Sequence, residues 1–166
     1  MPQIGLLTGD INLIGAFTST TLNVPSNTIT NAMVNSAAAI AASKLVHQYA
    51  KTYAQANAAA ADETRVIHSC TMAGGGTILN FEAGSIAAAV GDSTCTVDLK
   101  KDGTTCLSAP ITLDSGNAAY TPEAGTLTVT TFAQTDVLTI VIDATIGTGT
   151  LPTGVYCTCN FTEAAA

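Results

Sequence analysis

The sequence predicts a mainly β protein, in which an extended N-terminal arm and an Ala-rich helix precede a C-terminal antiparallel β-sandwich of jelly-roll or immunoglobulin-like type. Three observations lead to this fold class. Residues 62–166 contain short Thr- and Val-rich runs that are separated by Gly, Asp and Asn. Residues 31–43 read NAMVNSAAAIAAS, and residues 1–26 show neither a helical nor a strand period. We therefore expect two unlike parts, residues 1–61 and residues 62–166.

The N-terminal arm is expected to bury its apolar side chains against a partner surface. Its residues 1–26 include Gly5, Gly9 and Gly15, with apolar side chains between them. An equally good interpretation is a strand that pairs with the main domain. Residues 1–60 carry only Asp10, Lys44 and Lys51 as charged side chains. The low charge favours burial of this part in an assembly.

The predicted helix begins near Ser26, Asn27 and Thr28, which are favourable N-cap residues. A stripe of apolar and small residues follows at 4-3-4-3 spacing, which is typical of the seam of a coiled coil. The alanines give high helix propensity but little bulk, so a close approach between copies is expected. The stripe comprises Ile29, Met33, Ser36, Ile40 and Ser43, and continues imperfectly through Leu45 or Val46, Tyr49 and Tyr53.

The C-terminal part is expected to contain seven or eight strands with antiparallel connections. The clearest feature is the turn Lys101-Asp102-Gly103, where Gly103 permits the positive φ of a hairpin. The run at 137–144 is continuously apolar and is predicted to be central. A helix over 82–90 is the competing interpretation of that segment, and Gly84 favours a strand. The predicted strands are 65–71, 77–83, 85–90, 94–100, 104–111, 126–132, 137–144 and 154–162.

Composition excludes several classes of function. The formal net charge of −7 divides into +1 for residues 1–60 (two lysines, one aspartate) and −8 for residues 61–166 (three basic, eleven acidic). A nucleic-acid surface needs clustered basic side chains, and only Lys100 and Lys101 are adjacent. No segment reaches 18 uninterrupted apolar residues, and we expect neither a membrane span nor a signal peptide. The expected place of synthesis is a cytoplasm.

The cysteines and histidines are predicted to be structural. An odd number of cysteines in a reducing compartment argues against a disulfide framework. On a strand, Cys157 and Cys159 point to one face with Val155 and Phe161, as small buried hydrophobic residues do. His47 and His68 lie outside zinc-ligand spacing, so no metal site is expected. The five cysteines are Cys70, Cys95, Cys106, Cys157 and Cys159.

No catalytic motif is recognisable in the chain. His68 and Cys70 share one side of a strand, so a Cys–His pair is the most specific enzymatic alternative. The acidic loops 91–93 and 114–117 could bind calcium but lack EF-hand alternation. The aspartates at strand ends suit turns, and the Gly-rich pieces 74–76 and 147–149 lack phosphate-binding signatures. We expect no enzyme activity and no cofactor.

Several segments of the chain are distinctive, namely ITNAMVNSAAAIAASKL at 29–45, LVHQYAKTYAQ at 45–55, ADETRVIH at 61–68, VDLKKDGTT at 97–105 and GTGTLPTGVY at 147–156. Through these segments the chain resembles bacteriophage capsid decoration (cement) and head-fibre proteins. The resemblance implies a homotrimer on the exterior of the phage head. Its N-terminal part would bind the major capsid protein, and its β domain would project outward. Such proteins carry no catalytic residues.

The expected function is therefore a structural virion protein that stabilises the head through multivalent contacts. The alternative is a trimeric tail-fibre or receptor-binding component that contacts the host surface. A bacterial surface subunit and an enzyme are further alternatives. The side chains expected at the trimer interface or the capsid contact are Ile4, Leu6, Leu7, Ile11, Leu13, Ile14, Phe17, Ile29, Met33, Ile40, Leu45 and Tyr49.

Overall fold

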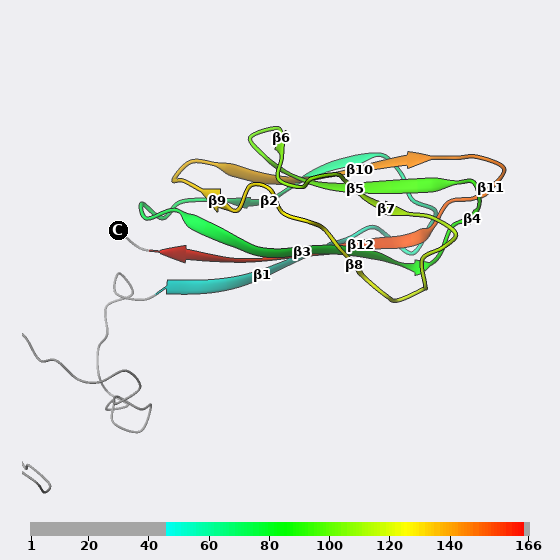
Figure 1. The fold of residues 1–166 in the computed structure, drawn as a ribbon, viewed down its shortest axis with the longest axis horizontal. Coiled ribbons are helices and arrows are strands. Elements are labelled where there is room, and N and C mark those ends of the chain that lie inside the picture. The colour runs from blue at the N-terminus through cyan, green and yellow to red at the C-terminus, as the bar shows by residue number, and fades with distance from the viewer. Residues whose placement is uncertain (1–45, 165–166) are drawn as a thin grey trace, which may run out of the picture. The chain divides into compact units, whose positions relative to one another are not determined.

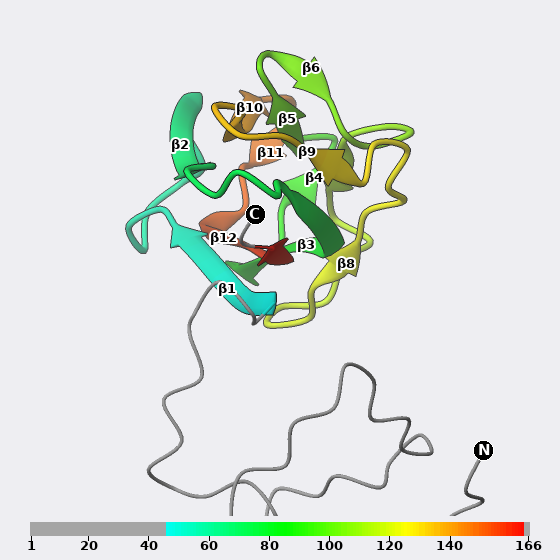
Figure 2. The ribbon, with the colours of Figure 1, turned by 90° about the vertical axis from the view of Figure 1, so that its left-hand side faces the viewer.

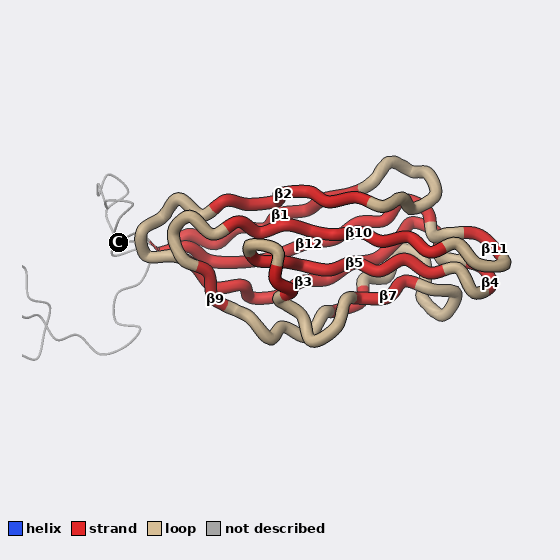
Figure 3. Tube along the Cα trace, turned by 90° about the horizontal axis from the view of Figure 1, so that it is seen from above, coloured by secondary structure: helices blue, strands red, loops and turns tan. Residues whose placement is uncertain are grey.

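The protein is described by a computed structural model over residues 46–164, and all structural statements concern that part. These residues form a domain of two antiparallel sheets that pack face to face, with strands running along its length (Figures 1 and 3). The longer strands are β1 (Val46–Ala54), β2 (Glu63–Ser69), β3 (Gly76–Ala87), β5 (Thr94–Lys101), β10 (Val137–Thr145) and β12 (Thr153–Ala164). The shorter strands are β4 (Val90–Gly91), β6 (Thr104–Thr105), β7 (Ile111–Leu113), β8 (Glu123–Ala124), β9 (Thr131–Phe132) and β11 (Gly149–Thr150).

The strand order is that of a jelly roll. One sheet has the order β1-β12-β3-β8, and β9 also pairs with β3. The other has the order β2-β10-β5-β6, and β7 also pairs with β5. If β6 with β7 and β8 with β9 are each counted as one interrupted strand, eight strand positions remain in two four-stranded sheets. This connectivity is the double-sheet jelly roll and not the immunoglobulin-like alternative.

The core lies between the sheets and is filled by alternate residues of the central strands. In β12 the inward positions Val155, Cys157, Cys159 and Phe161 are all buried, as the period of two predicts. In β5, which belongs to the opposite sheet, the alternate residues Cys95, Val97 and Leu99 are likewise buried in the core. Each of these cysteines therefore acts as a small apolar core residue.

The hairpin at Lys101-Asp102-Gly103 is confirmed. Strand β5 pairs with β6 across it, with φ angles of 48° at Asp102 and 84° at Gly103. Two successive positive φ values match the right-handed twist of the flanking strands. The central position of 137–144 is also confirmed, because β10 lies between β2 and β5.

Four expectations need correction. Residues 46–54, where the helical stripe was expected to continue, form strand β1 and pair with β12 over all nine residues. Alternate side chains of this segment, including Tyr49 and Tyr53, pack against the core, which suits a strand at a sheet edge. Because β1 belongs to the sandwich, the β domain includes residues before the boundary predicted near 61.

The strand expected over 126–132 is reduced to β9, since Leu127 and Val129 cover the core without forming a ladder. The segments 77–83 and 85–90 are mostly one strand, β3, instead of two. The preference for a strand over the competing helix at 82–90 is confirmed.

The two ends of the domain differ. We call the end where β1 begins and β12 ends the proximal end, because Val46 pairs there with Ala164. We call the opposite end, formed by the small sheet of β4 and β11, the distal end (Figure 1). The predicted N-terminal arm and Ala-rich helix, within residues 1–45, lie outside the described residues.

Candidate functional site

The most unusual feature of the domain is a buried histidine–glutamate contact at the proximal end. Glu163 occupies an inward position of β12, in phase with Phe161, and is 3% exposed. Its Oε1 lies 2.9 Å from Nε2 of His68, which comes from β2 in the opposite sheet. The side chain of His68 is 13% exposed. The pair therefore joins the two sheets through a polar contact inside an otherwise apolar layer.

Aromatic rings surround this pair. The ring centroid of His68 lies 4.5 Å from that of Phe161, 5.9 Å from that of Phe132 and 6.2 Å from that of Tyr49. Phe132 meets Phe161 edge to face at 5.6 Å. Such contacts fix the imidazole in place and keep water from the carboxylate.

The carboxyl group of Glu163 is held ionised. Burial alone raises its pKa, and this is the largest single influence. The hydrogen bond with His68, the nearby thiol of Cys70 and favourable electrostatics from His68 and His47 together outweigh burial and bring the pKa below its ordinary value. A buried carboxylate with a hydrogen-bond partner and favourable electrostatics is a satisfied structural anion.

Cys70 also faces Glu163 but is not an activated nucleophile. It is 2% exposed, and its Sγ donates to the carbonyl oxygen of Met72 at 3.6 Å. Burial, followed by the interaction with Glu163, raises the pKa of the thiol. A nucleophilic cysteine needs a lowered pKa and a base directed at its sulfur. Here Nε2 of His68 is directed at Glu163, so the arrangement suits packing of the two sheets.

A second polar cluster closes the flank between β1 and β2. The hydroxyl of Tyr53 donates to Glu63, and Nε of Arg65 lies 2.5 Å from Oε1 of the same carboxylate. Gln55 Nε2 adds a bond to Glu63 at 3.2 Å and another to the carbonyl of Ala61 at 2.7 Å. The hydrogen bonds from Tyr53 and Arg65 lower the pKa of Glu63. This cluster lies at the surface and holds β1 against β2.

The acidic loops serve turn geometry. Asp114 Oδ1 accepts from the backbone N–H of Gly116 at 2.7 Å, and Asn117 Oδ1 accepts from that of Asp114 at 2.5 Å. At the distal end, Asp92 accepts from the backbone and hydroxyl of Thr148. Within residues 46–164, no group of three or more His, Cys, Asp or Glu side chains is placed to hold a metal ion.

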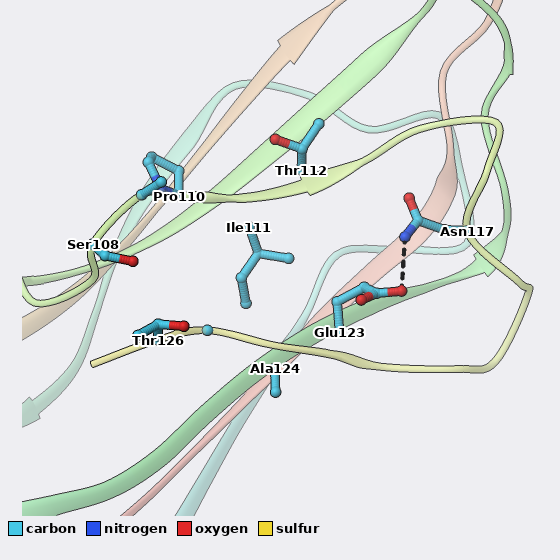
Figure 4. A pocket seen from close by; sticks show the side chains of 10 residues that line it. Ser108, Pro110, Ile111, Thr112, Asn117, Glu123, Ala124 and Thr126 are labelled. Atoms are coloured by element: carbon cyan, nitrogen blue, oxygen red, sulfur yellow. Dashed lines mark hydrogen bonds between the residues drawn. The ribbon is translucent and has the colours of Figure 1, made fainter. Parts of the chain in front are cut away.

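A shallow hollow of about 320 Å³ lies beside β7 and β8 (Figure 4). Glu123 is the one carboxylate among its lining residues, and it accepts a hydrogen bond from Asn117 Nδ2 at 3.0 Å. Catalysis by paired carboxylates would need a second acid across the hollow. The lining residues include Ser108, Pro110, Ile111, Thr112, Asn117, Glu123, Ala124 and Thr126.

The distal end presents apolar side chains to solvent. Val90 in β4 is 59% exposed, and Ile146 before β11 is 70% exposed. Tyr120 lies in the loop that leads to β8, at a positive φ of 60°, and is 72% exposed. Ser93 Oγ accepts from the N–H of Gly147 at 3.0 Å, so the two distal turns support each other.

Of the residues expected at an interface, Tyr49 is the one that the structure describes. Its ring lies 5.4 Å from that of Phe161 and covers the core edge beside His68. The other eleven lie outside the described residues. Sequence reasoning missed Glu163, although a glutamate in phase with four buried positions of one strand signals a buried carboxylate.

No helix within the described residues has the length and hydropathy needed to cross a membrane. No protein-family model matches the sequence, and no curated protein matches it. A solved structure of Desmodium yellow mottle tymovirus aligns with 99% of this chain and 96% of its own, at 13% identity and a TM-score of 0.34. A likeness at this TM-score supports no inference about the function of the chain.

Proposed function

We propose that the chain is a structural virion protein of a bacteriophage, a trimeric decoration or head-fibre protein on the capsid exterior. It binds the major capsid protein and stabilises the head without catalysis, and its partners are protein surfaces rather than nucleic acid or membrane. The observation that carries the proposal is the direction of the β domain, that is, which of its two ends receives the preceding chain. Its first strand begins at the proximal end, so the weakly charged residues 1–45 join the domain there and leave the distal end to face outward.

The cysteine, histidine and acidic side chains of the domain serve packing and turn geometry, which supports a binding role. The cysteines are buried, the His68–Glu163 pair joins two sheets, and Asp92 and Asp114 shape turns. The described residues carry eleven acidic and four basic side chains. An acidic outward surface keeps a particle soluble and prevents attachment to polyanions. Fold by itself does not determine function, so the proposal rests on these placements.

A second candidate is a trimeric tail-fibre or receptor-binding component. It is favoured by the exposure of Val90, Tyr120 and Ile146 at or near the distal end, because exposed apolar side chains are frequent at contact surfaces. In this alternative the distal end contacts the host surface.

Co-sedimentation with phage heads that lack the protein tests the proposal. We expect the full chain to sediment with heads, and a chain without residues 1–26 to stay in the supernatant with an unchanged urea midpoint. A matched variant, Ile146→Asp, should still bind heads. Binding by the truncated chain would refute the role of the arm. Loss of host-cell binding by Ile146→Asp, without any head binding by the full chain, would support the tail-component alternative.

A further inference from the structure

The two flanks of the sandwich are protected differently. On one flank the edge strands are β6, β8 and β9, of two residues each, and β7, of three. On the other flank lie β1, of nine residues, and β2, of seven (Figure 2). Among the described strands, β1 pairs with β12 alone, and its ladder shows no register shift. The pairing of β2 with β10 is broken by an irregularity at Leu138/Thr139. Strand β1 is therefore the long, regular edge of this domain.

The phase of the β1 ladder shows which backbone groups point outward. The N–H of Gln55 donates to the carbonyl of Val155 at 2.8 Å, in line with the register in which Ala54 faces Tyr156. In an antiparallel pair, hydrogen-bonded positions alternate with non-bonded ones. The odd-numbered residues of β1 therefore bond to β12. The even-numbered residues Gln48, Ala50 and Thr52 direct their N–H and C=O groups away from it.

The side chains of β1 leave this edge accessible. Edge strands are commonly protected by proline, bulges or charges that prevent pairing with another chain. Strand β1 has no proline, and its one Lys or Arg is Lys51, which is exposed and lies with its Nζ 6.0 Å from the Tyr49 ring centroid. The side opposite Tyr49 carries the small or neutral residues Gln48, Ala50, Thr52 and Ala54, all exposed.

We propose that β1 pairs in antiparallel fashion with β1 of a second copy of this chain, about a twofold axis at Ala50. All nine residues then pair, and every outward backbone group of an even-numbered residue finds a partner. Gln48 lies opposite Thr52 of the partner subunit. Two four-stranded sheets become one continuous sheet of eight strands.

Charge and strand overlap favour this register over the two neighbouring registers, with axes at Lys51 and at Tyr49. A twofold axis at Lys51 would set two lysines directly opposite each other, which is destabilising. An axis at Tyr49 would leave two residues of each strand unpaired. The axis at Ala50 places Lys51 opposite the aromatic ring of Tyr49 of the partner subunit, a favourable cation–π arrangement. The pairing is twofold, so it does not rest on the threefold contact or the virion role proposed above.

Disulfide cross-linking tests both the pairing and its register in the full chain. Ala50→Cys places two thiols opposite each other, with Cα atoms about 5.5 Å apart, within disulfide reach. Gln48→Cys is the matched control, because residue 48 faces residue 52 and not itself. The five native cysteines are buried, so they should contribute little cross-linked product of their own. Under mild oxidation we expect at least tenfold more linked dimer for Ala50→Cys, and linked heterodimer from mixed Gln48→Cys and Thr52→Cys. Equal yields from the two single variants would overturn the register, and the absence of linkage in every variant would overturn the pairing.

Amide hydrogen exchange provides a second, independent measurement, and Ala50→Pro is the variant that blocks the pairing. The N–H of residue 50 points outward, so proline there removes no hydrogen bond to β12, and the urea midpoint should stay unchanged. We expect slow amide exchange at Gln48, Ala50 and Thr52 in the wild-type protein, becoming fast on dilution. Protection that does not depend on concentration would mean that a segment of the same chain covers the edge, and would overturn the proposal. Fast exchange at every concentration would also overturn it.

Discussion

Glu163 and His68 come from opposite sheets and meet at 2.9 Å between Oε1 and Nε2, in a layer that is otherwise apolar. The contact ties the last strand of the domain to β2 at the end where the chain enters. Removing one partner from a buried pair costs more than the pair contributes, because the other group is left without compensation.

Glu163→Gln should destabilise the β domain. Glutamine keeps the shape of the side chain but loses the charge-assisted hydrogen bond, which is worth about 1.5–3 kcal/mol. Urea unfolding followed by intrinsic tyrosine fluorescence gives the free energy of unfolding. Glu123→Gln, an exposed residue, is the control and should change it by less than about 0.5 kcal/mol. Equal stability of the two variants would show that the buried pair contributes nothing.

Acid should weaken the domain partly through Glu163. Its pKa in the folded protein lies below the ordinary value of 4.5, so the unfolded state binds its proton first as pH falls. The stabilisation is therefore present above about pH 4.5 and is lost as pH drops through the folded-state pKa. The difference in unfolding free energy between wild type and Glu163→Gln should shrink over that range. A difference that stays constant from pH 7 to pH 3 would contradict this assignment.

The thiols should be inert in the folded protein and reactive after unfolding. Burial raises the pKa of Cys95 to about 11 and that of Cys157 and Cys159 to about 12. Cys70 and Cys106 are buried as well, and all five cysteines are free. A chromogenic disulfide reagent at pH 8 should react slowly with the native protein and should count five thiols in urea without reductant. Rapid reaction of a native thiol, or a count of three, would be inconsistent with the structure.

Tyr49→Ala should destabilise the sandwich, because Tyr49 lies on β1 and packs on Phe161. Removing a largely covered aromatic side chain costs about 2–4 kcal/mol. Gln48→Ala is the control on the opposite side of the same strand and should have little effect. Thermal unfolding compares the two variants. If residues 46–54 formed a helix away from the sheets, both substitutions would leave the melting temperature of the β domain unchanged.

Local sequence signals predicted most of the sandwich. The Lys101-Asp102-Gly103 turn, the apolar β10 and the alternating β12 each carry their information within a few residues, through turn chemistry and a period of two. Buried cysteines at 157 and 159 followed from the same period. These features do not depend on distant parts of the chain, so the sequence alone is sufficient for them.

The parts that the sequence did not predict depend on tertiary context. Tyr49 and Tyr53 lie four residues apart, which also suits a helix, and only pairing with β12 makes the segment a strand. Glu163 became a site only when folding brought His68 from the other sheet. The outward edge of β1 likewise depends on the phase of a ladder whose partner is about a hundred residues away, as in the pairing of Ala50 with Asn160.

The most direct test of the assembly proposal is the solution mass of the full chain carrying Ala50→Pro, measured by light scattering. That substitution blocks β1 pairing and isolates the contact proposed for the N-terminal part. The account predicts a mass three times that of the 16.7 kDa chain. A mass of one chain at every concentration would contradict the trimer on which the proposed capsid binding depends.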